Sequence, residues 1–134
     1  MTSATNKLIE NYYNAFNEFD MPLFFDLLTD DVAHDINQGK TEICKEAFKK
    51  FMAHMDACYK ERAYDIAIMA SEDGQHAAAT FMSEGKYLKT DGNLPAATGQ
   101  TYRLPVGCFF TIKNNKVARV TNYYNLNDWL AQVK

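Results

Sequence analysis

The sequence predicts an α+β fold in which helices cover one side of a curved, mainly antiparallel sheet. Apolar residues recur every three or four positions in the first half of the chain and at every second position in the second half. Helical segments followed by a run of strands are typical of α+β domains. At 134 residues, 47% of them hydrophobic, the chain is long enough to form one domain over residues 1–134 with its own core.

A first helix is predicted from about Thr5 to Phe19, because apolar side chains recur there at helical spacing. Asp20 then offers an N-cap side chain and Pro22 is tolerated in a first turn, so "LFFDLL" should form a short second helix ending near Thr29. The stripe on the first helix is rich in aromatic residues: Leu8, Tyr12, Phe16 and Phe19.

The stretch "VAHDINQG", from Val32 to Gly39, begins like a strand and ends like a turn. Gly39 and Thr41 are expected to open a third helix, the clearest amphipathic helix in the chain. Lysine side chains fall on its polar face. Its apolar face should consist of Cys44, Phe48, Phe51, Met52, Met55 and Tyr59.

Two hairpins are predicted beyond Arg62, where the hydrophobic period changes to two. The first joins "YDIAIMA" (64–70) to "HAAATFMSEGKYL" (76–88) through a turn at Asp73-Gly74. The second joins "QTYRLPVGCFFTIK" to "KVARVTNYYN" through a turn at Asn114-Asn115. Pro105 and Gly107 should interrupt its first strand with a bulge or bend, and "LNDWLAQV" should form a last short helix.

A strongly bent sheet closed at one end by helices makes a cone, and one face of each element should point into it. Periodicity is equally compatible with a packed interior and with a cavity. The side chains expected to face the interior are Tyr12, Phe16, Phe51, Met55, Tyr59, Phe81, Leu104, Val106, Cys108, Phe110, Val120, Asn122 and Tyr124.

Asp35 is the first candidate for chemistry. A carboxylate projecting into an aromatic, methionine-rich interior has a raised pKa, suited to taking a proton from carbon or water. The commoner use of a strand-end aspartate is to hydrogen-bond the backbone of the following turn. Because side chains alternate along a strand, His34 is expected to point to the opposite, outer side.

Tyr12 and Asn122 are the other polar candidates. A phenol inside an apolar stripe could donate its hydroxyl to a carbonyl oxygen that gains charge during enolisation, or could simply reach the rim. Asn122 could orient a ligand or serve the backbone near the bend. No two histidines have metal-ligand spacing, so no metal site is expected.

The overall composition argues against several classes of partner. A formal net charge of -3 and a pI near 5.5 give no electrostatic reason to expect nucleic acid or an anionic membrane. No apolar run approaches the roughly 18 residues of a membrane-spanning helix. Cys44, Cys58 and Cys108 have no CxxC spacing, and without a recognisable signal peptide they are expected to be reduced core residues of a cytoplasmic protein.

The strings "FNEFDMPLFFDLLTDDVAHDINQG" and "KVARVTNYYNLNDW" flank the long helix and the hairpins in a familiar order. In this order the whole chain resembles the nuclear-transport-factor-2-like superfamily, and within it the SnoaL-like, ketosteroid-isomerase-related proteins. The resemblance puts Tyr12 at the oxyanion-hole tyrosine of ketosteroid isomerases. When the alignment is allowed to shift by one residue after Asp30-Asp31, the resemblance also puts Asp35 at the proton-shuttling aspartate of these enzymes.

The resemblance also implies a function. A conical pocket would bind a small apolar or polycyclic carbonyl compound and catalyse cofactor-free proton transfer, as an isomerase or polyketide cyclase does. The position of the family's second, protonated aspartate falls on Cys108, a weak donor, which argues against steroid isomerisation itself. The outer sheet face would form a homodimer, because this fold covers only one face with helices.

Two alternatives remain beside this interpretation. One is a non-catalytic ligand-binding or dimerisation module, because fold alone does not determine function. The other is a hydrolase in which Asp35 activates water, which would need Arg103 or Arg119 to enter the pocket.

Overall fold

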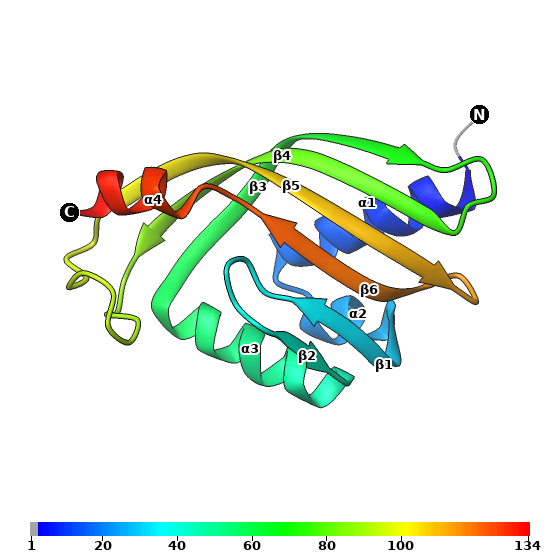
Figure 1. Ribbon diagram of the computed structural model, residues 1–134, viewed down its shortest axis with the longest axis horizontal. Coiled ribbons are helices and arrows are strands. Elements are labelled where there is room, and N and C mark those ends of the chain that lie inside the picture. The colour runs from blue at the N-terminus through cyan, green and yellow to red at the C-terminus, as the bar shows by residue number, and fades with distance from the viewer. Residues whose placement is uncertain (1–2) are drawn as a thin grey trace.

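The computed structural model describes residues 3–134 and is an α+β fold with one six-stranded sheet, in the order β2-β1-β6-β5-β4-β3 (Figure 1). All neighbouring strands pair antiparallel except β1 and β6, which are parallel. In chain order the elements are α1 (Ala4–Glu18), α2 (Met21–Asp26), β1 (Leu28–Asp35), β2 (Thr41–Ile43), α3 (Lys45–Cys58), β3 (Tyr59–Ala70), β4 (His76–Tyr87), β5 (Thr101–Lys113), β6 (Lys116–Tyr123) and α4 (Leu126–Val133).

The first two helices form where the sequence predicts them. Ser3 caps α1 by accepting a hydrogen bond from the backbone of Asn6, and Asp20 caps α2 in the same way through Leu23. The predicted end of α2 near Thr29 is wrong. The helix ends at Asp26, because Leu28 already begins β1 and pairs with β6.

The predicted start of the third helix is also wrong. Instead of opening α3, Thr41–Ile43 forms a short edge strand, β2, that pairs antiparallel with the end of β1. The helix begins at Lys45, after Cys44 with a φ of 86°. Cys44 is therefore an exposed residue before the helix and not part of its apolar face.

The long strands differ from the prediction in where β3 begins and in where the register of the sheet is irregular. β3 begins at Tyr59, directly after α3, so this tyrosine belongs to the sheet. Pro105 and Gly107 cause no register shift between β5 and β4, and the irregularity of β5 lies against β6, between Thr111 and Ile112. Because β6 pairs with β5 only from Gly107 onward, Pro105 has a neighbouring strand on one side alone, where a sheet tolerates proline.

The predicted turn at Asn114-Asn115 is confirmed. Both residues have positive φ, 52° and 58°, as a two-residue hairpin turn with the favoured twist requires. The predicted last helix is confirmed as α4, which is capped by Asn125.

The helices α1, α2 and α3 lie against the concave side of the curved sheet (Figure 1). One core cluster joins α1, α2 and the middle of the sheet around Tyr12, Phe24 and Phe110. A second cluster, around Tyr87, Tyr102 and Trp129, joins α4 to the far ends of the long strands. Between residues 3 and 134 no helix has both the length and the apolar character needed to cross a membrane.

Candidate functional site

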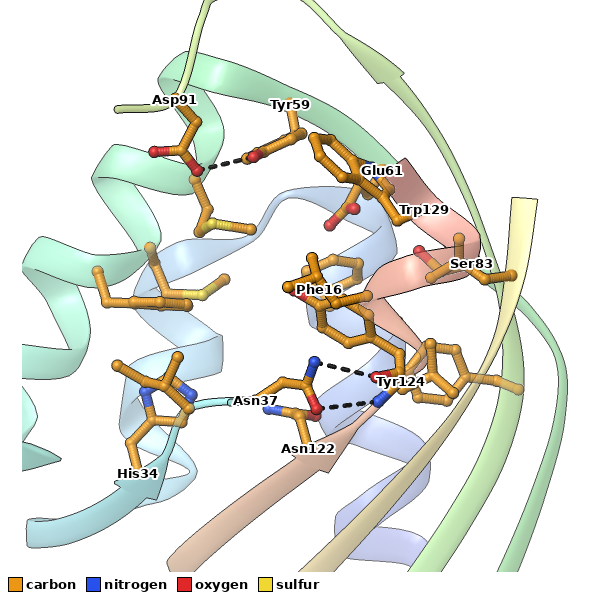
Figure 2. Close-up of a pocket in the computed structure, with 18 of the residues that line it drawn as sticks. Phe16, His34, Asn37, Tyr59, Glu61, Ser83, Asp91, Asn122, Tyr124 and Trp129 are labelled. Atoms are coloured by element: carbon orange, nitrogen blue, oxygen red, sulfur yellow. Dashed lines mark hydrogen bonds between the residues drawn. The ribbon is translucent and has the colours of Figure 1, made fainter. Parts of the chain in front are cut away.

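A cavity of about 280 Å³ lies between the helices and the concave face of the sheet (Figure 2). A second hollow of about 410 Å³ adjoins it and shares the side chains of Phe16, Met52, Met55, Tyr59 and Glu61. The apolar walls of the first cavity come from all four helices and from the sheet. Its polar lining consists of Tyr12, Tyr13, His34, Asn37, Tyr59, Glu61, Ser83, Asp91, Tyr102, Asn122 and Tyr124.

His34, and not Asp35, is the β1 side chain that faces this cavity. Only 2% of His34 is exposed, and its ring stacks on Phe48 at 4.3 Å between centroids and meets Phe51 edge-on at 4.6 Å. Burial lowers the pKa of His34, and the nearby carboxylates of Glu42 and Asp35 only partly oppose this. The imidazole is therefore neutral near pH 7.

Asp35 lies on the outer face of the sheet. Its carboxylate binds the Arg119 guanidinium through two contacts of 2.8 Å and accepts hydrogen bonds from the hydroxyls of Thr41 and Thr121 at 2.6 Å. Partial burial alone would raise the pKa of Asp35, but these hydrogen bonds outweigh it and lower the pKa to about 2. The prediction that Asp35 projects into the pocket with a raised pKa is wrong.

The alternation of side chains along β1 explains this reversal. His34 and Asp35 do point to opposite sides of the sheet, as expected. However, Val32, His34 and Ile36 stand at every second position and point to the inner face. Val32 is completely buried, so its parity determines which face of the strand turns inward. Val32 and Ile36, two positions before and after His34, are apolar, and this signal could have identified His34 as the inward-facing residue.

Nine of the twelve predicted site residues line the cavity. They are Tyr12, Phe16, Phe51, Met55, Tyr59, Phe81, Val106, Asn122 and Tyr124. Besides Asp35, the two that do not are Cys108 and Phe110, which point inward but are covered by α1. Tyr12 lies 5.2 Å from Phe110 between ring centroids, so side chains fill the sheet centre and the cavity begins beyond them.

The burial of Cys108 also removes it from any ligand. Burial raises the pKa of its thiol to about 12, so the thiol is protonated as well as covered. It therefore cannot replace a second acid in the pocket.

Tyr12 lines the cavity and packs against Phe24 at 4.6 Å between ring centroids. Burial raises the pKa of Tyr12 well above its usual value. The hydroxyl therefore stays protonated at any working pH and acts as a hydrogen-bond donor.

Polar residues that sequence reasoning missed line the rest of the cavity. Asp91, from the loop after β4, accepts a hydrogen bond of 2.7 Å from the Tyr59 hydroxyl. Glu61 accepts one from the Tyr102 hydroxyl. Neither acid stands in a recognisable motif, because each partner comes from a distant part of the chain.

Asn37 fixes one wall of the cavity. Its side-chain amide donates to the carbonyl of Tyr124 at 3.0 Å and accepts from the amide of Tyr124 at 3.2 Å (Figure 2). The loop after β1 is thereby tied to the segment after β6.

Near the cavity, three side chains bring potential metal ligands together. His54 Nε2, Cys58 Sγ and a carboxylate oxygen of Asp91 lie within 4.8 Å of one another. These donor types suit zinc. However, His54 Nε2 and Asp91 Oδ1 are 2.6 Å apart, so a hydrogen bond already accounts for two of the three. The expectation that no metal or cofactor is bound stays a prediction.

Comparisons with known proteins agree with the fold. The sequence profile of the SnoaL-like domain matches residues 9–120. No curated protein sequence matches the chain.

Several solved structures are similar over nearly their whole length. A "putative polyketide cyclase" from Pseudomonas putida KT2440 is 54% identical, with all of both chains covered and a TM-score of 0.96. Another from Xanthomonas campestris pv. campestris is 44% identical, covering 98% of this chain and 97% of that one, with a TM-score of 0.95. An NTF2-like protein of unknown function from Burkholderia pseudomallei K96243 is 13% identical, with 99% of each chain covered and a TM-score of 0.78. This last likeness identifies the fold as NTF2-like.

Proposed function

This chain belongs to the SnoaL-like domain family, and on that premise we propose that it catalyses cofactor-free proton transfer on a small carbonyl compound held in the cavity. The reaction is of the isomerase or cyclase type. His34 removes a proton from the carbon beside the carbonyl, and Tyr12 hydrogen-bonds the oxygen that becomes negative. The names of the similar polyketide cyclases support a cyclic or polycyclic ligand.

The observation that carries this proposal is a buried histidine facing an apolar cavity with a ring nitrogen unpaired. Nδ1 of His34 is buried and has no hydrogen-bond partner. Leaving such a group unpaired costs about 1–3 kcal/mol. Because burial lowers the pKa of His34, the imidazole is unprotonated near pH 7 and can accept a proton as a general base.

Glu42 on the neighbouring strand β2 lies beside His34 and influences its pKa. The two residues are directly opposite each other in the β1–β2 pair, so their side chains leave the same face. Oε1 of Glu42 is also buried without a partner, and its charge raises the pKa of His34 against the effect of burial. A hydrogen bond from Nδ1–H to this carboxylate would leave Nε2 free to accept a proton.

Tyr12 supplies the donor for the developing oxyanion. A preorganised donor in a water-poor site is worth far more than the same donor in water. Asn122 and Tyr124, on the sheet side of the cavity, would orient the ligand.

The exchange of carbon-bound protons tests the proposal. In deuterated water, 2-tetralone should exchange its α-protons faster with the protein than without it. The His34→Asn variant should lose about 100-fold of this rate or more, because general bases contribute factors of that size. Asp35→Asn, one residue away, is the matched control and should keep the rate. An unchanged rate in His34→Asn would exclude the histidine as the base.

The non-catalytic alternative predicts a different result. A pure binding protein would hold 2-tetralone without accelerating exchange. The hydrolase alternative with Asp35 as water activator has lost its basis, because Asp35 and Arg119 pair with each other on the outer face.

We also propose that the protein forms a homodimer through the outer sheet face. Phe109 and Tyr123 are 52% and 59% exposed there, with their rings 5.9 Å apart between centroids. Large apolar side chains gathered on an exposed sheet suit a self-complementary interface.

A further inference from the structure

Three residues that lie side by side on neighbouring strands place a second polar group in the cavity wall. Glu61 on β3 lies opposite Gly85 on β4, and Gly85 lies opposite Tyr102 on β5. Residues in register across neighbouring strands present their side chains on the same face. Here that is the concave face, and both Glu61 and Tyr102 line the cavity.

The middle residue of the row has to be glycine. A Cβ atom at Gly85 would lie 2.3 Å from both Cζ and Oη of Tyr102, which is far inside van der Waals contact. The tyrosine ring therefore crosses over the glycine, and its hydroxyl donates a hydrogen bond to Oε2 of Glu61 two strands away. Tyr102 is 3% exposed and packs edge-on against Trp129 at 6.0 Å between centroids, which fixes the ring in this position.

The other carboxyl oxygen, Oε1, remains available. No side chain among residues 3–134 donates a hydrogen bond to it, and no lysine, arginine or histidine pairs with Glu61. Figure 2 places Glu61 and His34 on opposite sides of the cavity. Burial raises the pKa of Glu61, with the Tyr102 hydroxyl opposing it more weakly, so this carboxyl takes up a proton more readily than an exposed one.

The surroundings restrict what can bind to this oxygen. Aromatic rings, among them Tyr59, Tyr102 and Trp129, lie around it and favour a flat ring. An anionic ligand group would meet a second acid and would be repelled. A neutral hydroxyl can donate to the carboxylate without adding charge.

We propose that the free oxygen of Glu61 binds a phenolic or enolic hydroxyl at the far end of a flat ligand from His34. The ligand is then a hydroxylated aromatic or polyketone molecule with oxygen atoms at both ends. This inference rests on the proposed function for the carbonyl end, but it concerns a separate contact.

A pair of probes that differ in one donor tests the contact. Binding of 2-naphthol and of 2-methoxynaphthalene, which cannot donate a hydrogen bond, is measured by isothermal titration calorimetry. The wild-type protein should bind 2-naphthol about 10-fold or more tightly, since a hydrogen bond to a charged group is worth this much. In Glu61→Gln the ratio should fall to about one, because the amide presents a donor, whereas Asp35→Asn, on the outer face of the sheet, should keep the wild-type ratio.

The other possible results also decide whether Glu61 makes this contact. Equal affinities in the wild type, or the same ratio in Glu61→Gln, would overturn the assignment. If Glu61→Gln does not fold, Glu61→Asp withdraws the carboxyl by one methylene and should lower the ratio likewise. A ratio that depends on Glu61 together with no α-proton exchange would leave this contact standing and remove the catalytic role of His34. If neither probe binds, the Glu61 contact fails, and the exchange of the 2-tetralone α-protons decides the proposed function separately.

Discussion

Asp35 and Arg119 are joined by two contacts of 2.8 Å across the parallel pair β1–β6, on the side of the sheet away from the cavity. Two threonine hydroxyls complete the coordination of the carboxylate. A residue that sequence reasoning assigned to catalysis thus stabilises the fold.

Replacing Asp35 should therefore lower stability. Asp35→Asn is expected to reduce the free energy of unfolding by about 1–2 kcal/mol, because the charge-assisted bonds are lost from a side chain that is largely shielded. The pKa of Asp35 is lowered from 3.8 to about 2, so its contribution is present above pH 3.8 and is lost as the pH falls toward 2. Urea unfolding across this range measures both effects.

Asp30→Asn is the control for this prediction. Asp30 lies on the same strand and contacts Lys45 at 3.5 Å, but its side chain is fully exposed. Its removal should change stability little. Equal effects of the two substitutions would contradict the structural role of Asp35.

His34 should make the free energy of unfolding depend on pH at higher pH values than Asp35 does, below pH 6.5. Burial lowers its pKa from 6.5, so above that pH both folded and unfolded states are neutral and no difference exists. Below it the unfolded chain takes up a proton first, and the free energy of unfolding falls. Urea titrations above and below pH 6.5 should detect this fall in the wild type and a smaller one in His34→Asn.

Gly85→Ala should displace the Tyr102 ring. Overpacking of this kind typically costs about 1–3 kcal/mol. A smaller residue at position 102 relieves the clash, so Gly85→Ala should cost much less in a Tyr102→Leu background. Additive effects in this double-mutant cycle would mean that the ring does not depend on the glycine. Gly107→Ala, on β5 with open space around the position and no positive φ, controls for the general loss of a strand glycine outside the row.

Asn37→Asp should loosen the wall that carries Tyr124. The substitution keeps the acceptor for the Tyr124 amide but puts a carboxylate against the Tyr124 carbonyl in place of a donor. A loss of about 1 kcal/mol is expected, because a partly buried hydrogen bond is replaced by a repulsive contact. Thermal unfolding measures the loss, and hydrogen exchange at the Tyr124 amide should accelerate. Unchanged exchange at that amide would contradict the clamp.

The dimer prediction concerns the outer face alone. Phe109→Glu should convert a dimer to a monomer in sedimentation velocity, because it puts like charges together at the interface. Leu23→Glu, at a residue 42% exposed on α2, should leave the dimer intact. A monomeric wild-type protein would refute the proposal directly.

The fold was largely predictable because periodicity reports which face of each element is buried. The Asn114-Asn115 turn and the cap at Asp20 are local signals that the sequence shows directly. The edge strand β2 was missed because three residues are too short for a period, and only pairing with β1 forms it.

The site was less predictable. Alternation correctly separated His34 from Asp35, yet the choice of inner face depended on Val32 and Ile36 as well. No recognisable sequence pattern contains Glu61, Gly85 and Tyr102, because only the register of the strands brings them into one row. Asp91 comes from a loop, where no periodicity predicts the direction of a side chain.

Trp129 is the chain's single tryptophan, and it stands in the cavity wall beside the proposed hydroxyl contact. Its indole emission therefore comes from one known place. The protein carries a built-in optical reporter, so a library of unlabelled aromatic compounds can be screened by fluorescence quenching before any substrate has been identified.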